Sequence, residues 1–79
     1  MDRLEKLLAA ARNNPNGLSF KDFEALLKRA HWKFDRQKGS HQIWYSPKKS
    51  LISIQPRGGK AKSYQVKQFL GVYDRESNG

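Results

Sequence analysis

The most informative stretch of the chain lies in its middle: Arg36-Gln37-Lys38-Gly39-Ser40-His41-Gln42-Ile43-Trp44-Tyr45. It reads as the end of one strand, a tight turn and the start of a second strand. Gly39 can adopt the positive φ that a hairpin turn requires. His41 is then the first residue of the second strand. An imidazole, which exchanges protons near neutral pH, is thereby placed at a hairpin corner.

Three strands are predicted around this turn, over residues 32–37, 41–46 and 51–55. The short turns between them favour an antiparallel meander. Side chains alternate between the two faces of a strand, and we expect Trp44 to point inward and His41 outward. Ile43 would then be exposed. Pro56 is expected to end the third strand, and residues 57–62 to form a flexible basic loop.

Three helices are predicted outside the strands. The first covers residues 2–12 and ends before the Asn-Asn-Pro-Asn-Gly segment, where Pro and Gly oppose continuation. The second begins at Ser19, whose hydroxyl can cap the amide of Asp22, with Leu18 and Phe23 at the hydrophobic staple positions. A final helix is capped by Ser63. The expected core uses these aromatic residues together with the Leu and Ile side chains: Phe20, Phe23, Trp32, Phe34, Trp44 and Phe69.

The order of these elements predicts an α+β fold. It is an α-β-β-β-α unit with a three-stranded antiparallel sheet and an additional N-terminal helix, and it resembles a double-stranded RNA-binding domain. Two helices would cover one sheet face and leave the other to solvent. The 79 residues are expected to form a single domain. It comprises a helical extension over 1–17, a core over 18–73 and a frayed tail over 74–79.

Composition excludes several classes of site. The chain has no cysteine, and its two histidines lie near no carboxylate cluster, so we expect neither a metal site nor a cofactor. No apolar run approaches the roughly 18 residues of a membrane span. The N-terminus lacks the apolar region of a signal peptide, which predicts a cytoplasmic protein.

The charge balance indicates a polyanionic partner. The chain carries 16 Lys and Arg against 7 Asp and Glu, a formal net charge of +9. Such an excess in a small domain favours nucleic acid. An anionic membrane surface is a weaker alternative, because the helices do not segregate their cations opposite a broad apolar face. An acidic protein partner remains a third possibility and is compatible with the first.

The motif residues resemble those of HicA, the toxin of bacterial HicBA toxin–antitoxin pairs, also called the YcfA-like family. The resemblance rests on Gly39-Ser40-His41 after a basic strand end, on the aromatic strand that follows, and on the third strand ending near Pro56. The segments Gly58-Gly59-Lys60-Ala61-Lys62 and Tyr64-Gln65-Val66-Lys67-Gln68 resemble a longer branch of the family. The match extends over about residues 18–73.

This resemblance implies an mRNA interferase, an endoribonuclease that arrests translation until a HicB-type antitoxin protein binds it. The family's catalytic histidine corresponds to His41. The common family pattern has a second histidine directly after the first, where this chain has Gln42. His31, at the end of the second helix, is interpreted as a favourable charge at the helix C-terminus and not as a catalytic group. Residues 1–17 extend beyond the shortest members.

The expected chemistry uses one imidazole and many cations. RNA supplies its own nucleophile, the 2′-hydroxyl, so one group must take its proton and the phosphate charge must be stabilised. Candidate RNA-binding residues surround His41 along the sequence: Arg36, Lys38, Ser40, Lys48, Lys49, Lys60 and Lys62. We expect metal-independent cleavage of mRNA by a monomer. The alternative is a non-catalytic RNA-binding module of the same fold.

Overall fold

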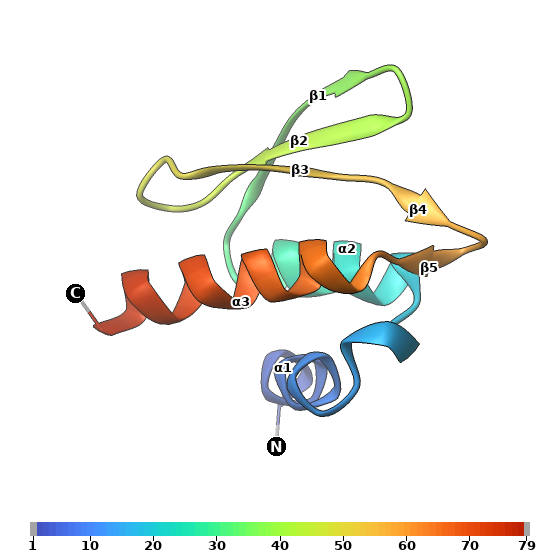
Figure 1. Cartoon of the computed structure of the whole chain (residues 1–79). Coiled ribbons are helices and arrows are strands. Elements are labelled where there is room, and N and C mark those ends of the chain that lie inside the picture. Colours follow the sequence, from blue (N-terminus) through green and yellow to red (C-terminus); the bar gives the residue numbers. More distant parts are fainter. Residues whose placement is uncertain (1, 79) are drawn as a thin grey trace.

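The computed structural model describes residues 2–78. Its helices are α1 (Arg3–Asn13), a short 3-10 helix η1 (Pro15–Gly17), α2 (Phe20–Arg29) and α3 (Ser63–Asn78). Its strands are β1 (Lys33–Lys38), β2 (His41–Tyr45), β3 (Leu51–Ile54), β4 (Pro56–Arg57) and β5 (Lys60–Ala61). The sheet β1-β2-β3 lies on α2 and α3, and α1 lies beneath these helices (Figure 1). The predicted α+β fold, with its antiparallel three-stranded sheet and additional N-terminal helix, is confirmed.

Helix α1 belongs to the hydrophobic core. Asp2 caps it by accepting a hydrogen bond from the amide of Glu5 at 2.8 Å. Leu7 and Ala11 are buried in the same cluster as the side chains of α2 and α3. Arg12 donates two hydrogen bonds to Asp74 of α3, at 2.7 and 3.0 Å. The N-terminal extension is thus joined to the C-terminal helix by both packing and charge.

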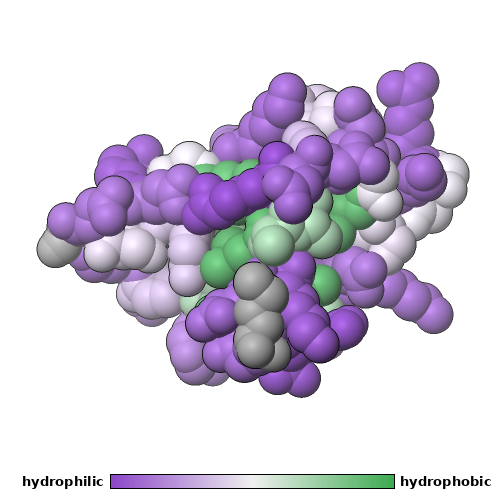
Figure 2. Space-filling model, turned by 90° about the horizontal axis from the view of Figure 1, so that it is seen from below, coloured by the Kyte–Doolittle hydropathy of each residue, from purple (hydrophilic) through white to green (hydrophobic). Residues whose placement is uncertain are grey.

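The surface on the α1 side is mostly hydrophilic. Figure 2 shows this side of the molecule from below, with a central hydrophobic area enclosed by hydrophilic side chains. Partly buried apolar residues pack against the core from several elements: Leu4, Leu8, Ala25, Val72 and Tyr73. The helices α1 and α3 thus bury most of their apolar side chains against one another and against α2.

Helix α2 has the predicted start and an unpredicted end. The Ser19 hydroxyl accepts from the amide of Asp22 at 3.0 Å, which confirms the cap. At the other end, His31 adopts a left-handed conformation with φ 67°. Its amide donates to the carbonyl of Lys28, and the amide of Trp32 donates to the carbonyl of Leu27. This is the Schellman pattern, which usually uses glycine at the left-handed position.

Inward-facing residues of the three-stranded sheet pack against the helices, with Trp44 of the central strand in the middle. Trp44, on β2, pairs with Phe34 of β1 and Ile52 of β3. Trp44 and Ile52 are almost fully buried against the helices. A register shift between Phe34 and Arg36 leaves one extra residue in β1, which is a β-bulge. The inward orientation of Trp44 is therefore confirmed.

Two predicted exposures in the sheet are wrong. Phe34, expected in the core, is 50% exposed because β1 is an edge strand; its ring contacts Trp44 edge-on at 5.7 Å. Ile43, expected to be exposed, is only 7% exposed. Ile43 lies on the central strand, so its side chain has a cross-strand neighbour on each side, Arg36 on β1 and Ser53 on β3. Long polar side chains can shield an apolar neighbour in this way.

The basic segment after β3 is an ordered hairpin, so the prediction of a flexible loop is wrong. Pro56 pairs with Ala61, and Arg57 pairs with Lys60. Gly58 and Gly59 both have positive φ, as a two-residue type I′ turn requires.

The β4–β5 hairpin is attached to the start of α2 by backbone hydrogen bonds. The amide of Ala61 donates to the carbonyl of Leu18 at 2.9 Å. A second such bond joins the amide of Phe20 to Gly59.

Helix α3 differs from its prediction at both ends. Ser63 is its first residue rather than its cap, and the carbonyl of Lys62 accepts the first amides. The helix continues through Asn78 and so includes residues 74–78 of the expected frayed tail; Gly79 lies outside the described residues. The reason is Glu76, which accepts a hydrogen bond of 2.6 Å from the buried hydroxyl of Ser46. This contact ties the last turns of α3 to the β2–β3 turn.

Candidate active site

His41 is positioned by the β1–β2 turn. Gly39 has φ 61° at the first position of a two-residue turn, which matches a type II′ hairpin. His41 is the first residue of β2, and its Cα partner on β1 is Lys38. The imidazole is partly exposed. A cation thus lies directly across the strand pair from a group able to give or take a proton.

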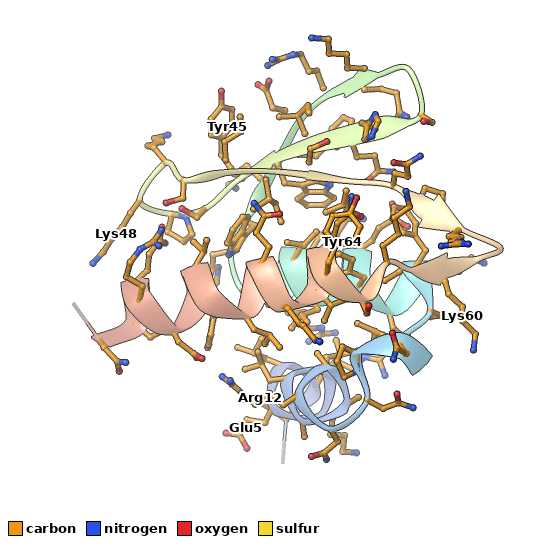
Figure 3. The ribbon with its side chains drawn as sticks, viewed as in Figure 1. Glu5, Arg12, Tyr45, Lys48, Lys60 and Tyr64 are labelled. Carbon is orange, nitrogen blue, oxygen red and sulfur yellow. The ribbon has the colours of Figure 1, made fainter. Side chains whose placement is uncertain are left out.

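Gln42 determines which face of the sheet His41 occupies. The Gln42 side-chain amide donates to Glu24 of α2 at 3.1 Å, and its oxygen accepts from Trp44 Nε1 at 3.0 Å. Gln42 therefore points toward the helices, and His41 points to the opposite face. Figure 3 shows Tyr45, on the same face as His41 by alternation, pointing away from the helices. A residue at position 42 cannot share the face of His41.

The outer sheet face is lined by cations from β1. Lys38 and Arg36 are the cross-strand partners of His41 and Ile43, so they share that face. Arg36 forms an ion pair with Asp35. Hydrogen bonding to Asp35, and then to Tyr45, raises the pKa of Arg36 above its ordinary value. Arg36 is thus charged but already partnered, whereas Lys38 is the cation directly across from His41.

Ser40 connects the turn to the rest of the domain. Its hydroxyl accepts a hydrogen bond from Gln55 Nε2 at 3.3 Å. The backbone amide of Gln55 in turn donates to Oε1 of the buried Gln65 at 3.0 Å. The turn before His41 is therefore held to the first turns of α3 by side chains from two other segments.

Lys60 and Lys62 lie at the same end of the sheet as His41. Ile54, the last residue of β3, pairs with Gln42, and the β4–β5 hairpin begins just after it. Figure 1 shows this hairpin and the β1–β2 turn on the same side of the molecule. Both lysines line a cavity of about 360 Å³ at the start of α3. Arg57 and Tyr64 also line it.

Arg57 and Tyr64 are cavity residues to which the sequence alone assigns no functional role. The sequence predicts Arg57 only as part of the basic loop, and Tyr64 only as part of the final helix and of a segment that resembles the family. The sequence does carry a signal, because Tyr64 lies two residues after Lys62 in a segment that also holds Arg57 and Lys60. Only the folded hairpin shows that these side chains line one cavity.

Three other residues considered from the sequence lie at the opposite end of the sheet. Lys48 and Lys49 occupy the β2–β3 turn, beyond the end of β2, which places them more than about 13 Å along the strand from His41. Lys48 and Lys60 lie on opposite sides in Figure 3. His31 precedes Lys33, whose partner Tyr45 is at the far end of β2 from His41. The structure does not bring the two histidines together.

Glu76 lies beside Lys48 of the β2–β3 turn. Burial alone would raise the pKa of Glu76. Hydrogen bonds from Ser46 and Ser50, the backbone amide of Lys48 and the charge of Lys48 outweigh burial and lower that pKa. The Lys48 charge is therefore partly balanced within the protein.

Within residues 2–78, no group of three or more His, Cys, Asp or Glu side chains is arranged to hold a metal ion. No helix in that part of the chain is long and apolar enough to cross a membrane.

Comparison with known families assigns the chain to one of them. The family model described as the HicA toxin of bacterial toxin–antitoxin systems matches residues 20–71. The chain belongs to the HicA toxin family. Its matched region runs from the start of α2 into α3 and contains His41, Lys60, Lys62 and Tyr64. Helix α1 and the last turns of α3 lie outside the match.

Membership in the HicA family gives the chain the role of a toxin and implies an antitoxin partner. Neither the curated proteins nor the solved structures that were compared with it give a significant match.

Proposed function

We propose that this HicA-family toxin is an endoribonuclease that cleaves mRNA and arrests translation, and that a HicB-type antitoxin neutralises it. The observation that supports this most is the position of His41. It is a partly exposed imidazole on the outer sheet face, directly across from Lys38. The formal net charge of +9 favours a polyanionic substrate.

The proposed reaction is attack of the RNA 2′-hydroxyl on the adjacent phosphorus. His41 takes the proton of the 2′-hydroxyl or delivers a proton to the departing 5′-oxygen, and water fills the other role. The new P–O bond replaces the bond to the 5′-oxygen, leaving a 2′,3′-cyclic phosphate and a free 5′-hydroxyl. Lys38 stabilises the charge that develops on the phosphate oxygens. This scheme requires no metal and no second histidine.

The substrate contacts proposed from the sequence fall into two groups. Lys38, Ser40, Lys60 and Lys62 lie at the His41 end of the sheet and are assigned to the nucleotides beside the cleaved bond. Arg36 stands next to them, engaged with Asp35. Lys48 and Lys49 lie at the far end and are assigned to RNA farther along the strand.

The decisive experiment is cleavage of end-labelled RNA by the purified protein in EDTA, with analysis of the product ends. The parent protein should produce 2′,3′-cyclic phosphate ends. His41→Ala should slow cleavage by at least roughly 100-fold, with the free energy of unfolding changed by less than about 0.5 kcal/mol. The matched control is His31→Asn, because Asn tolerates the left-handed conformation of that position.

Two outcomes would contradict the proposal. Equal cleavage by His41→Ala and the parent would remove His41 from the chemistry. RNA binding by the parent without any cleavage would favour the alternative, a non-catalytic RNA-binding module.

A further inference from the structure

The cavity at the start of α3 has a lining suited to nucleic acid. Three cations line it, Arg57, Lys60 and Lys62, together with Ser63 and Tyr64. No acidic side chain of residues 2–78 is part of this lining. Arg57 and Lys60 belong to a hairpin fixed by backbone hydrogen bonds to the start of α2, and Lys62 lies between this hairpin and α3, so their backbone positions are set before any ligand arrives.

Tyr64 is the most exposed of the large apolar side chains within residues 2–78, at 62%. Its hydroxyl accepts a long hydrogen bond of 3.4 Å from Gln65, a side chain only 3% exposed. Exposed Phe34 packs edge-on against Trp44, but no aromatic partner of Tyr64 occurs in the described chain. Packing of the core therefore does not account for an aromatic ring here.

The cavity is connected to the turn that carries His41. Gln65 accepts from the amide of Gln55, and Gln55 donates to the hydroxyl of Ser40, the residue before His41. The chain of contacts thus runs from Tyr64 through two glutamines to the catalytic turn. A strand of RNA lying across this end of the sheet would meet both features.

We infer that the cavity is a nucleotide-binding subsite for single-stranded RNA, in which Tyr64 stacks on an unpaired base and Arg57, Lys60 and Lys62 hold the neighbouring phosphates. Proteins bind single strands by this combination of an aromatic platform and a cationic groove. The inference rests on the proposed function, because it assigns the base next to the cleaved bond to Tyr64. Base stacking, rather than base-edge hydrogen bonding, would tolerate any base at that position.

The test measures binding of a short unstructured RNA to proteins that all carry His41→Ala, so that no cleavage occurs. Tyr64→Ala should weaken binding roughly 5- to 150-fold, the range of one lost stacked base. Tyr64→Phe keeps the ring and should bind RNA as tightly as the protein that carries His41→Ala alone. Tyr64→Leu keeps apolar bulk without a flat ring and should bind as weakly as Tyr64→Ala. The matched control is Phe34→Leu, which removes another exposed ring and should leave affinity unchanged.

A set of RNAs with one abasic nucleotide at successive positions locates the stacked base. For the protein that carries His41→Ala alone, an abasic nucleotide at one position should lower the RNA affinity as much as Tyr64→Ala lowers it for the intact RNA. That same position should cost Tyr64→Ala almost nothing further, because the stacking is already absent.

Several results would contradict the inference that this cavity is a nucleotide-binding subsite. Unchanged RNA affinity in Tyr64→Ala would do so, as would an equal loss in Tyr64→Phe, which would point to the hydroxyl. Loss of antitoxin binding with RNA binding intact would make the cavity a protein-docking site. Each of these leaves cleavage by the parent and its dependence on His41 unaffected, so the subsite can fail while the proposed function stands.

Discussion

Gln42 and Glu24 form a hydrogen bond of 3.1 Å between the central strand and helix α2, directly behind the outward-facing His41. A shift of one residue along a strand would exchange its two faces. The Gln42 contact, with the bond it accepts from Trp44, opposes such a shift. Gln42 therefore stabilises the orientation of β2 that leaves His41 on the outer face of the sheet.

We predict that Gln42→Ala lowers the free energy of unfolding by about 1–3 kcal/mol, because the indole N–H of Trp44 loses its acceptor in a partly buried site. RNA cleavage should persist at temperatures where the variant is folded. Chemical denaturation and a cleavage assay on the same sample measure both effects. A stable variant without activity would instead place Gln42 in the chemistry.

His31 holds a conformation that suits glycine, with φ 67°. His31→Gly should raise the free energy of unfolding by about 0.5–1 kcal/mol, since relief of the left-handed penalty exceeds the greater flexibility of glycine in the unfolded chain. Thermal or urea unfolding measures this change. Arg29→Gly, within α2, is the control and should destabilise the protein by a similar amount. Lower stability of His31→Gly would contradict the Schellman assignment.

Protonation of Asp74 should make the free energy of unfolding depend on pH in the acidic range. Hydrogen bonds from Arg12 hold the pKa of Asp74 below its usual range. A carboxyl with a lowered folded-state pKa stabilises the protein above its unfolded pKa of about 3.9, and this contribution is lost as the pH falls through the folded-state value. Asp74→Asn should therefore flatten the stability curve below about pH 4.

The loss at neutral pH should stay below about 1 kcal/mol, because the Arg12 and Asp74 side chains are 45% and 47% exposed. Unfolding measured across a pH series gives both quantities. Arg12→Gln should produce the same flattening, and the double variant should add nothing to it. Additive effects would show that the two residues act separately.

Lys60 and Lys62 should contribute to RNA binding through phosphate contacts. Replacing both with Ala should weaken binding similarly for all sequences, and the slope of log affinity against log salt should fall by roughly 0.7 per lost contact. Lys48→Ala with Lys49→Ala is the matched control at the opposite end of the sheet and should lower the slope less. Titrations at several salt concentrations decide this, and an unchanged slope for Lys60→Ala with Lys62→Ala would assign these lysines to another partner.

The antitoxin is expected to compete with RNA. A HicB-type partner with an acidic face would associate quickly with so basic a toxin. It should cover the His41 face or the cations beside it, and so block RNA binding and cleavage together. The measurement is a titration of RNA-bound His41→Ala protein with the antitoxin. A ternary complex that keeps its RNA would show that inhibition acts at a distance from the bound strand.

Features that arise between neighbouring residues can be predicted from the local sequence. The Ser19 cap, the glycine turn before His41 and the alternation around Trp44 each depend on residues within a few positions of one another. These signals were enough to predict helices α1, α2 and α3, strands β1, β2 and β3, and the position of His41 at the start of β2, but not the β4–β5 hairpin. The HicA resemblance rested on the same short segments.

Which positions are exposed and which are buried depends on tertiary contacts, because the segments that cover a residue lie far away in the chain. Ile43 is shielded since its strand is central, and Phe34 is exposed since its strand is at an edge. The basic segment is a hairpin because its amides and carbonyls bond to Leu18 and Phe20. That distant attachment fixes the hairpin so that Arg57 and Lys60 line one cavity with Tyr64, an arrangement that the local sequence does not specify.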